Sequence, residues 1–146
     1  MAIKLDLKGF DEMLRKIEKA NGNVDAAAKK CMDKSAQIMQ DELKSQMQAA
    51  DLQNTMSRLI SRMPSPRVEN DHGLWTAKVG YEKGAYDPKN PSDAYEVIFI
   101  NYGTPRRTKH GKVQARGFIA KAKKKAKSKI KKEQEKTLDE ILRGLQ

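Results

Sequence analysis

The chain has 146 residues, of which 30 are Lys or Arg and 19 are Asp or Glu, so its formal net charge is +11. Hydrophobic residues make up only 38% and aromatic residues 5%, which predicts one domain over residues 1–146 with a modest core and long exposed helices. No run approaches the ~20 apolar residues that cross a bilayer, and residues 1–10 lack the apolar core of a secretory leader. The single cysteine cannot form an intramolecular disulfide, which fits a reducing compartment.

The N-terminal part, residues 1–50, combines a short alternating segment with two helical patterns. Ile3–Leu7 alternates apolar and polar residues, which predicts a short strand. Phe10–Ile17 has apolar residues at i, i+3, i+4 and i+7, which predicts a short amphipathic helix. Asn23 is a suitable N-cap for a second helix of about 25 residues. The expected apolar face of that helix comprises Val24, Ala27, Ala28, Cys31, Met32, Ser35, Ile38, Met39, Leu43 and Met47.

The middle part, residues 51–100, starts with a pattern that has two interpretations. Leu52–Met63 fits a short helix, but Leu59-Ile60 also fits the beginning of a strand. Pro64–Pro66 ends either element, because proline lacks the backbone N–H. Further on, Gly84–Pro91 has the composition of a loop.

A strand and a second ambiguous segment follow. Leu74–Tyr81 is rich in β-forming residues and is the best strand of the chain, with Trp75 expected in the core. Either Ser92 or Asp93 can cap a short helix after the loop. Val97–Ile100 fits that helix and a buried strand equally well, so the periodicity leaves both open.

The charge is concentrated in Asn101–Lys132, which has 13 Lys or Arg and no Asp or Glu, whereas the rest of the chain has 17 basic and 19 acidic residues. The first half, residues 101–117, is interrupted by Gly and Pro, which predicts a turn at Tyr102–Pro105 and then a basic loop. In that turn Gly103 is expected to adopt a positive φ. The basic side chains of the loop are Arg106, Arg107, Lys109, Lys112 and Arg116.

The last part, residues 118–146, carries the pattern of a helix from about Phe118 to Arg143, roughly 39 Å long. Its apolar stripe narrows at Ala122 and Ala126, which predicts a close approach to the element on which it packs. The predicted fold class is therefore α+β, with two N-terminal helices, a small antiparallel sheet and a long basic C-terminal helix. The lysines expected on the face opposite the stripe are Lys121, Lys124, Lys125, Lys131 and Lys132.

The sequence offers little that would support catalysis. His72 and His110 both lie in Gly-flanked polar segments, and neither has Cys, Asp or Glu at the spacing of metal ligands. Tyr102–Pro105 lacks the Lys-Ser/Thr that completes a phosphate-binding loop. We therefore expect no enzyme activity, no cofactor and no metal site, and two surface-loop histidines.

Three counter-charges are compatible with the basic segment: nucleic-acid phosphate, an acidic protein surface, or solvent and salt. The complete exclusion of acidic residues differs from ordinary surfaces, which mix both signs. Aromatic residues that could stack on bases are found only at its edges, at Tyr102 and Phe118. Any contact with nucleic acid is therefore expected to involve phosphates without sequence reading.

Two short motifs resemble those of the gp-ten-like head-to-tail joining proteins, the neck and tail-completion family of tailed phages. Ile100–Thr104, then the basic loop, then Arg116–Ala122 is similar to the aromatic-Gly-Thr signature of that family followed by the start of its last helix. Asn54–Ile60 is similar to the family's Thr-Gly-x-Leu segment. The chain differs from the common pattern in having Asn101 instead of an acid, Gly117 instead of Pro and Met56 instead of Gly.

The resemblance implies a virion structural protein without enzyme activity. Such a protein is made in the bacterial cytoplasm and assembles as a ring at the head–tail junction. It implies portal-side and tail-side partner proteins, self-association, and non-specific contact with packaged DNA, and no membrane is involved. The alternative is an architectural DNA-binding protein that uses the same basic segment.

Overall fold

The computed structural model describes residues 10–50, 52–72, 74–81, 92–103 and 114–145 of the chain. These residues form five helices and one two-stranded antiparallel sheet, which confirms the predicted α+β class. The predicted strand at Ile3–Leu7 and the predicted loop at Gly84–Pro91 lie outside the described residues. The elements are α1 (Phe10–Lys19), α2 (Val24–Ala49), α3 (Gln53–Ser61), β1 (Arg67–Asp71), β2 (Leu74–Lys78), α4 (Asp93–Tyr102) and α5 (Phe118–Gly144).

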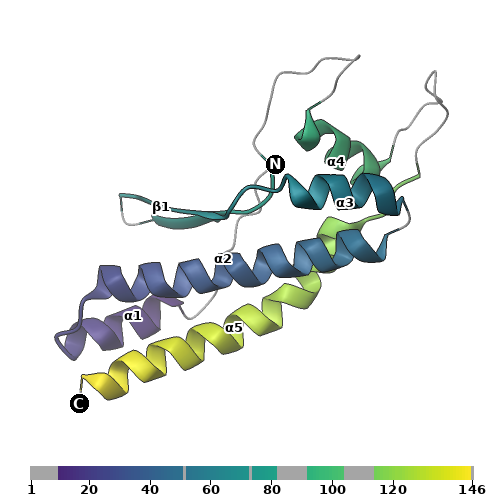
Figure 1. Ribbon diagram of the computed structural model, residues 1–146. Coiled ribbons are helices and arrows are strands. Elements are labelled where there is room, and N and C mark those ends of the chain that lie inside the picture. Colours follow the sequence, from purple (N-terminus) through teal and green to yellow (C-terminus); the bar gives the residue numbers. More distant parts are fainter. Residues whose placement is uncertain (1–9, 51, 73, 82–91, 104–113, 146) are drawn as a thin grey trace.

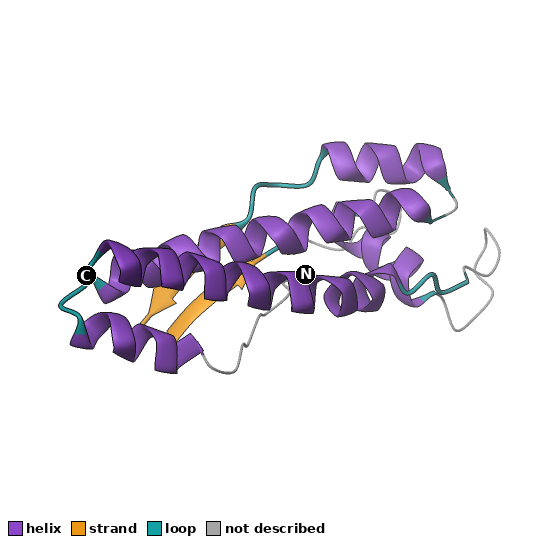
Figure 2. Cartoon of the chain, turned by 90° about the horizontal axis from the view of Figure 1, so that it is seen from below, coloured by secondary structure: helices purple, strands orange, loops and turns teal. Residues whose placement is uncertain are grey.

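The central element is α2, and the other elements are arranged around it in layers (Figure 1). On one side α5 runs antiparallel to α2, with α1 beside both where α2 begins and α5 ends. On the other side lie the hairpin of β1 and β2 and the helices α3 and α4. Seen from below, the helices therefore cover the strands (Figure 2). None of the described helices is long and apolar enough to cross a membrane.

The second predicted helix is confirmed as α2, which has 26 residues. The side chain of Asn23 accepts a hydrogen bond from the backbone N–H of Ala26 at 3.1 Å, as expected of an N-cap. The helix predicted from about Phe118 to Arg143 is confirmed as α5, which has 27 residues. Both helices bury most of the apolar stripe that the periodicity assigned to them, but Val24 and Ile38 of α2 are only half-buried and Leu145 after α5 is exposed.

Most of the core lies between these two helices. Met39, Leu43 and Met47 of α2 are fully buried in one cluster with Phe118 and Ile130 of α5. Burying a side chain of this size contributes roughly 1.5–3 kcal/mol, so α5 is held mainly by its apolar stripe. A smaller cluster at the α1 end comprises Ile17, Ala27, Cys31 and Leu138.

Ala122 and Ala126 are both 0% exposed, in agreement with the predicted close approach of α5 to its partner helix. Polar contacts continue the interface beyond the alanines. Gln134 Nε2 donates to Ser35 Oγ at 3.0 Å, and both residues are buried. Because buried polar groups need partners, this pair favours one register of α5 along α2.

The two ambiguous segments are both helices. Leu59 and Ile60 belong to α3, so the strand alternative at this position is wrong. Val97–Ile100 belongs to α4, whose buried residues Ala94, Val97 and Ile100 recur every three residues. That spacing places them on one helical face, whereas a strand would have turned successive residues to opposite faces.

The hairpin was predicted only in part. Residues 67–71 form β1, which was not predicted, because four of its five residues are exposed and polar and show no apolar alternation. In the ladder Val68 pairs with Ala77, and Asn70 pairs with Trp75. The predicted strand at Leu74–Tyr81 is shorter than expected and ends at Lys78. Trp75 is half-buried and packs against the main core.

Candidate functional site

The end of α4 and the beginning of α5 are joined directly, although ten residues between them lie outside the described part of the chain. Arg116 donates its backbone N–H to the carbonyl oxygen of Ile100 at 3.1 Å. Gly117 donates its backbone N–H to the carbonyl oxygen of Asn101 at 3.0 Å. We call this junction, residues 100–103 with residues 116–119, the α4–α5 clamp.

Asn101 completes the clamp with its side chain. Its Oδ1 accepts a hydrogen bond from the backbone N–H of Ile119 at 2.9 Å, and the residue is only 3% exposed. The residue at the N-cap position of α5 is Gly117, which has no side chain to satisfy the first free N–H groups of the helix. Asn101 therefore caps α5 from α4.

The predicted positive φ of Gly103 is confirmed. Its φ is 75° and its ψ is −178°, a combination that is almost exclusive to glycine. The N–H of Gly103 donates to the carbonyl oxygen of Phe99 at 2.8 Å and so ends α4. Gly117 is also left-handed, at φ 61° and ψ 26°.

Most charged residues of the predicted basic loop lie outside the described residues. The residues concerned are Arg106, Arg107, Lys109, His110 and Lys112. Arg116 is described: it is partly exposed, and its guanidinium donates to the carbonyl oxygen of Gln114 at 2.8 Å. Of the predicted loop cations, only Arg116 is therefore located, at the clamp.

The predicted helix lysines all lie on the exposed surface of α5. Lys123 and Lys127 are also exposed on this helix, although they were not predicted. Only positions directly opposite the apolar stripe were predicted to be exposed, whereas exposed residues extend around most of the helix circumference. We define the lysine face as Lys121, Lys123, Lys124, Lys125, Lys127, Lys131 and Lys132.

Lys129 differs from the lysine face. Its Nζ forms an ion pair with Glu42 of α2, whose carboxylate is 9% exposed. A second ion pair, between Lys34 Nζ and Glu133 Oε1 at 3.4 Å, links the helices further along. No such ion pair involves a residue of the lysine face within the part of the chain that the structure describes.

The lysine face repels itself. Lys121, Lys124, Lys127 and Lys131 follow one another at three- or four-residue spacing, and like charges at this spacing destabilise a helix by about 0.2–0.5 kcal/mol per pair. Lys121 also lies near the N-terminus of α5, where the helix dipole disfavours positive charge. The apolar stripe offsets these costs. An anion bound along the face would remove them.

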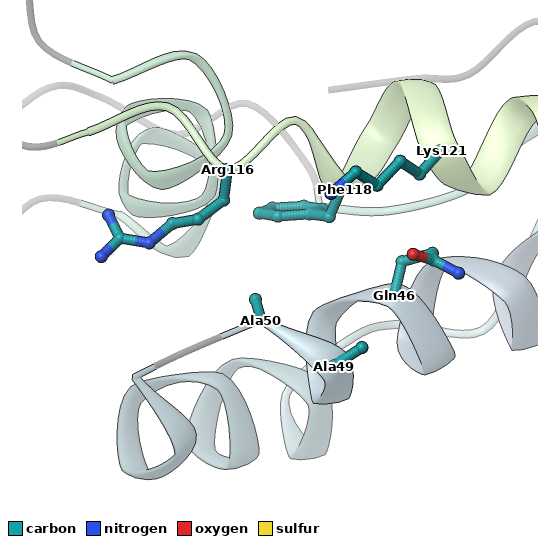
Figure 3. A pocket seen from close by; sticks show the side chains of 6 residues that line it. All are labelled: Gln46, Ala49, Ala50, Arg116, Phe118 and Lys121. Atoms are coloured by element: carbon teal, nitrogen blue, oxygen red, sulfur yellow. The ribbon is translucent and has the colours of Figure 1, made fainter.

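A small pocket of about 110 Å³ lies where α2 ends and α5 begins (Figure 3). Phe118 forms one wall, and Arg116 and Lys121 lie on either side of its ring in this view. Gln46, Ala49 and Ala50 of the α2 end complete the lining. The pocket brings a loop cation and a helix cation to one place, but its volume suits only a small group.

The described residues contain few side chains that could act in catalysis or bind a metal ion. His72 is exposed, and its Nδ1 lies 2.5 Å from the carboxylate of Asp71. The described segments contain no group of three or more His, Cys, Asp or Glu side chains that could hold a metal ion. Burial raises the pKa of the Cys31 thiol to about 11, against the opposing effect of Lys34 and Lys30. Burial also raises the pKa of Tyr81, whose hydroxyl donates to the carbonyl oxygen of Leu59 at 2.6 Å.

Comparisons with protein-family models, with curated proteins and with solved structures yield no match for this chain.

Proposed function

We propose that this chain is a structural protein of a tailed phage or prophage that joins head and tail at the neck. It acts through ring assembly and protein contacts near the DNA channel, without enzyme activity and without a cofactor. The observation that carries the proposal is the α4–α5 clamp. The two parts of the sequence that resemble the head-to-tail joining family, Ile100–Thr104 and Arg116–Ala122, are linked there by three hydrogen bonds between residues 100–101 and residues 116–119.

The distribution of surfaces supports an assembly role. The lysine face lies on α5, on one side of α2, whereas the hairpin, α3 and α4 lie on the other side (Figure 1). In a closed ring the copies are related by rotation, so every copy would turn its lysine face in an equivalent direction. In a ring, weak charge contacts of the individual subunits add up through multivalency.

The proposed setting is the head–tail junction of the virion, after synthesis in the host bacterial cytoplasm. The proposed partners are other copies of the chain and the portal-side and tail-side proteins of the same phage. Light scattering of the purified chain over a range of concentrations, alone and with these partners, tests the proposal. We expect a defined oligomer or a joint complex. A strict monomer that joins none of the partners would refute it.

His72→Ala serves as the control for the absence of catalysis. His72 is exposed, and its ring lies beside the carboxylate of the neighbouring Asp71. Particles assembled with this variant should therefore form and infect normally. Correctly formed particles that fail to infect would reveal chemistry that this proposal lacks.

A second candidate function is architectural DNA binding, in which contact with DNA is the whole role of the protein. It is favoured by the lysine face, which has no acidic neighbour on α5 from Phe118 to Lys132. The layered body around α2 is larger than a simple charge carrier requires, which is why we rank this function second. A chain that binds duplex DNA as a monomer and joins no partner protein would reverse the order.

A further inference from the structure

The lysine face is unlike a surface that binds another protein. Protein interfaces have an apolar centre and are depleted in lysine. On α5 the large apolar residues between Phe118 and Lys132 are all buried against the body: Phe118 is 1%, Ile119 4% and Ile130 0% exposed. Apart from lysines, the exposed residues of this stretch are Ala120 and Ser128. The face is therefore positively charged and has no exposed apolar centre.

Its charge density is close to that of duplex DNA. From Lys121 to Lys132 the helix rises by roughly 17 Å. Over that length duplex DNA presents about ten phosphates, one per ~1.7 Å of its axis. The seven lysines of the face are thus similar in number to the phosphates that the two strands of a duplex present over the same length.

The residue types indicate which part of the nucleic acid is contacted. Base edges are read mainly by Arg, Asn and Gln, whereas lysine acts as a flexible point charge. Single strands are held by stacking on aromatic rings, but the aromatic residue of this stretch, Phe118, is buried. Backbone phosphates of a duplex remain as the matching ligand.

We propose that the lysine face of α5 binds the phosphate backbone of duplex DNA without reading its sequence. Lys129 is not part of the contact, because Glu42 already holds it. The proposal names the ligand of the face and applies under either candidate function. DNA binding by the purified chain requires no partner protein, so its failure can be distinguished from a failure of ring assembly.

The test measures binding of the full chain to two unrelated mixed-sequence duplexes by fluorescence anisotropy between 50 and 200 mM salt. We expect equal affinities for both duplexes and a steep loss of affinity with salt. Each neutralised phosphate contributes about −0.9 to the slope of log K against log salt, so seven contacts give a slope of about −6. A slope near zero, or a clear preference for one duplex, would overturn the proposal.

A quadruple variant locates the contact. Changing Lys124, Lys125, Lys131 and Lys132 to Gln should make the slope shallower by up to about 3–4 units. The matched control removes four exposed lysines of α1 and α2 and changes the net charge equally. It consists of Lys16→Gln, Lys19→Gln, Lys29→Gln and Lys30→Gln.

The control should keep a slope close to that of the unchanged chain. An equal effect of both variants would reduce the binding to net charge and overturn the assignment to α5. A quadruple variant that binds DNA as before but no longer joins a partner protein would also overturn it, in favour of an acidic protein surface. Replacing the same four lysines with Arg keeps the charge and should restore the slope, which separates lost contacts from misfolding.

Discussion

Asn101 shows how one side chain can serve two helices. It belongs to the last turn of α4, yet its Oδ1 satisfies the N–H of Ile119 in the first turn of α5. Because Gly117 cannot provide a capping side chain, removal of the amide would leave a buried donor without a partner.

Asn101→Ala should therefore lower the free energy of unfolding by about 1–2 kcal/mol, as for the loss of a good N-cap. Urea denaturation followed by circular dichroism measures the change. Asn54→Ala is the matched control, since Asn54 is an exposed residue of α3 whose side chain forms no hydrogen bond within the described residues. It should change the stability by no more than about 0.5 kcal/mol. Equal effects of the two substitutions would show that the capping bond contributes nothing.

At position 103, in contrast, the backbone conformation requires a residue without a side chain. At φ 75° and ψ −178° a β-branched residue is strained. Gly103→Val should destabilise the fold by roughly 1–3 kcal/mol, seen as a lower midpoint of thermal unfolding. Gly144→Ala is the control, because nothing lies within 4 Å of the added Cβ. An unchanged midpoint for Gly103→Val would contradict the strained turn.

At the scale of elements, the pairing of α2 with α5 depends on small residues. Ala126 is fully buried on the α5 stripe. Ala126→Leu should force the helices apart and cost about 1–3 kcal/mol by overpacking. Ala120→Leu adds the same atoms to an exposed position of the same helix and should cost less than about 0.5 kcal/mol. Similar unfolding midpoints for both variants would mean that the helices do not approach closely at Ala126.

The elements also show where sequence reasoning succeeds. α2 and α5 were predictable because each is long and buries one continuous stripe, so the 3.6-residue period is repeated many times. α4 was ambiguous because its ten residues are mostly apolar, and its period becomes visible only through burial. β1 was missed because it has one half-buried residue, Val68, and is defined by its ladder with β2.

Part of the candidate site could also be predicted from the sequence. Five lysines of the face follow from their position opposite the stripe, and the φ of Gly103 follows from its place in a turn. The capping role of Asn101 and the ion pair of Lys129 with Glu42 could not be predicted, because each joins residues that are distant in sequence. Such contacts depend on how α4 and α2 meet α5.

At the scale of the whole molecule, the charge of the lysine face opposes folding. No lysine of this face forms an ion pair within the described residues, and the exposed ion pairs elsewhere in the molecule contribute only roughly 0–1 kcal/mol each. We therefore expect the repulsion among these lysines to exceed the attraction within the ion pairs. Salt weakens both.

Raising sodium chloride from 10 to 300 mM should then raise the midpoint of thermal unfolding by a few degrees, because salt screens the repulsion between exposed like charges. The variant with Lys124, Lys125, Lys131 and Lys132 changed to Gln should start from a higher midpoint at low salt and gain less. Differential scanning calorimetry measures both. A midpoint of the unchanged chain that falls with salt would show that attractive pairs dominate.

The α4–α5 clamp has a consequence for how this chain can vary. Two backbone hydrogen bonds join the two ends of the segment between Asn101 and Arg116, so we expect the fold to depend on this junction more than on the number of residues between its ends. Closure entropy grows only with the logarithm of length, and doubling such a segment costs about 0.6 kcal/mol. Ten Gly/Ser residues inserted after Thr108 should therefore lower the free energy of unfolding by less than about 1 kcal/mol in a urea titration. A larger loss would show that the segment that receives the insertion contributes to stability. With a small cost, an engineered chain could carry a foreign peptide or an affinity tag at this position.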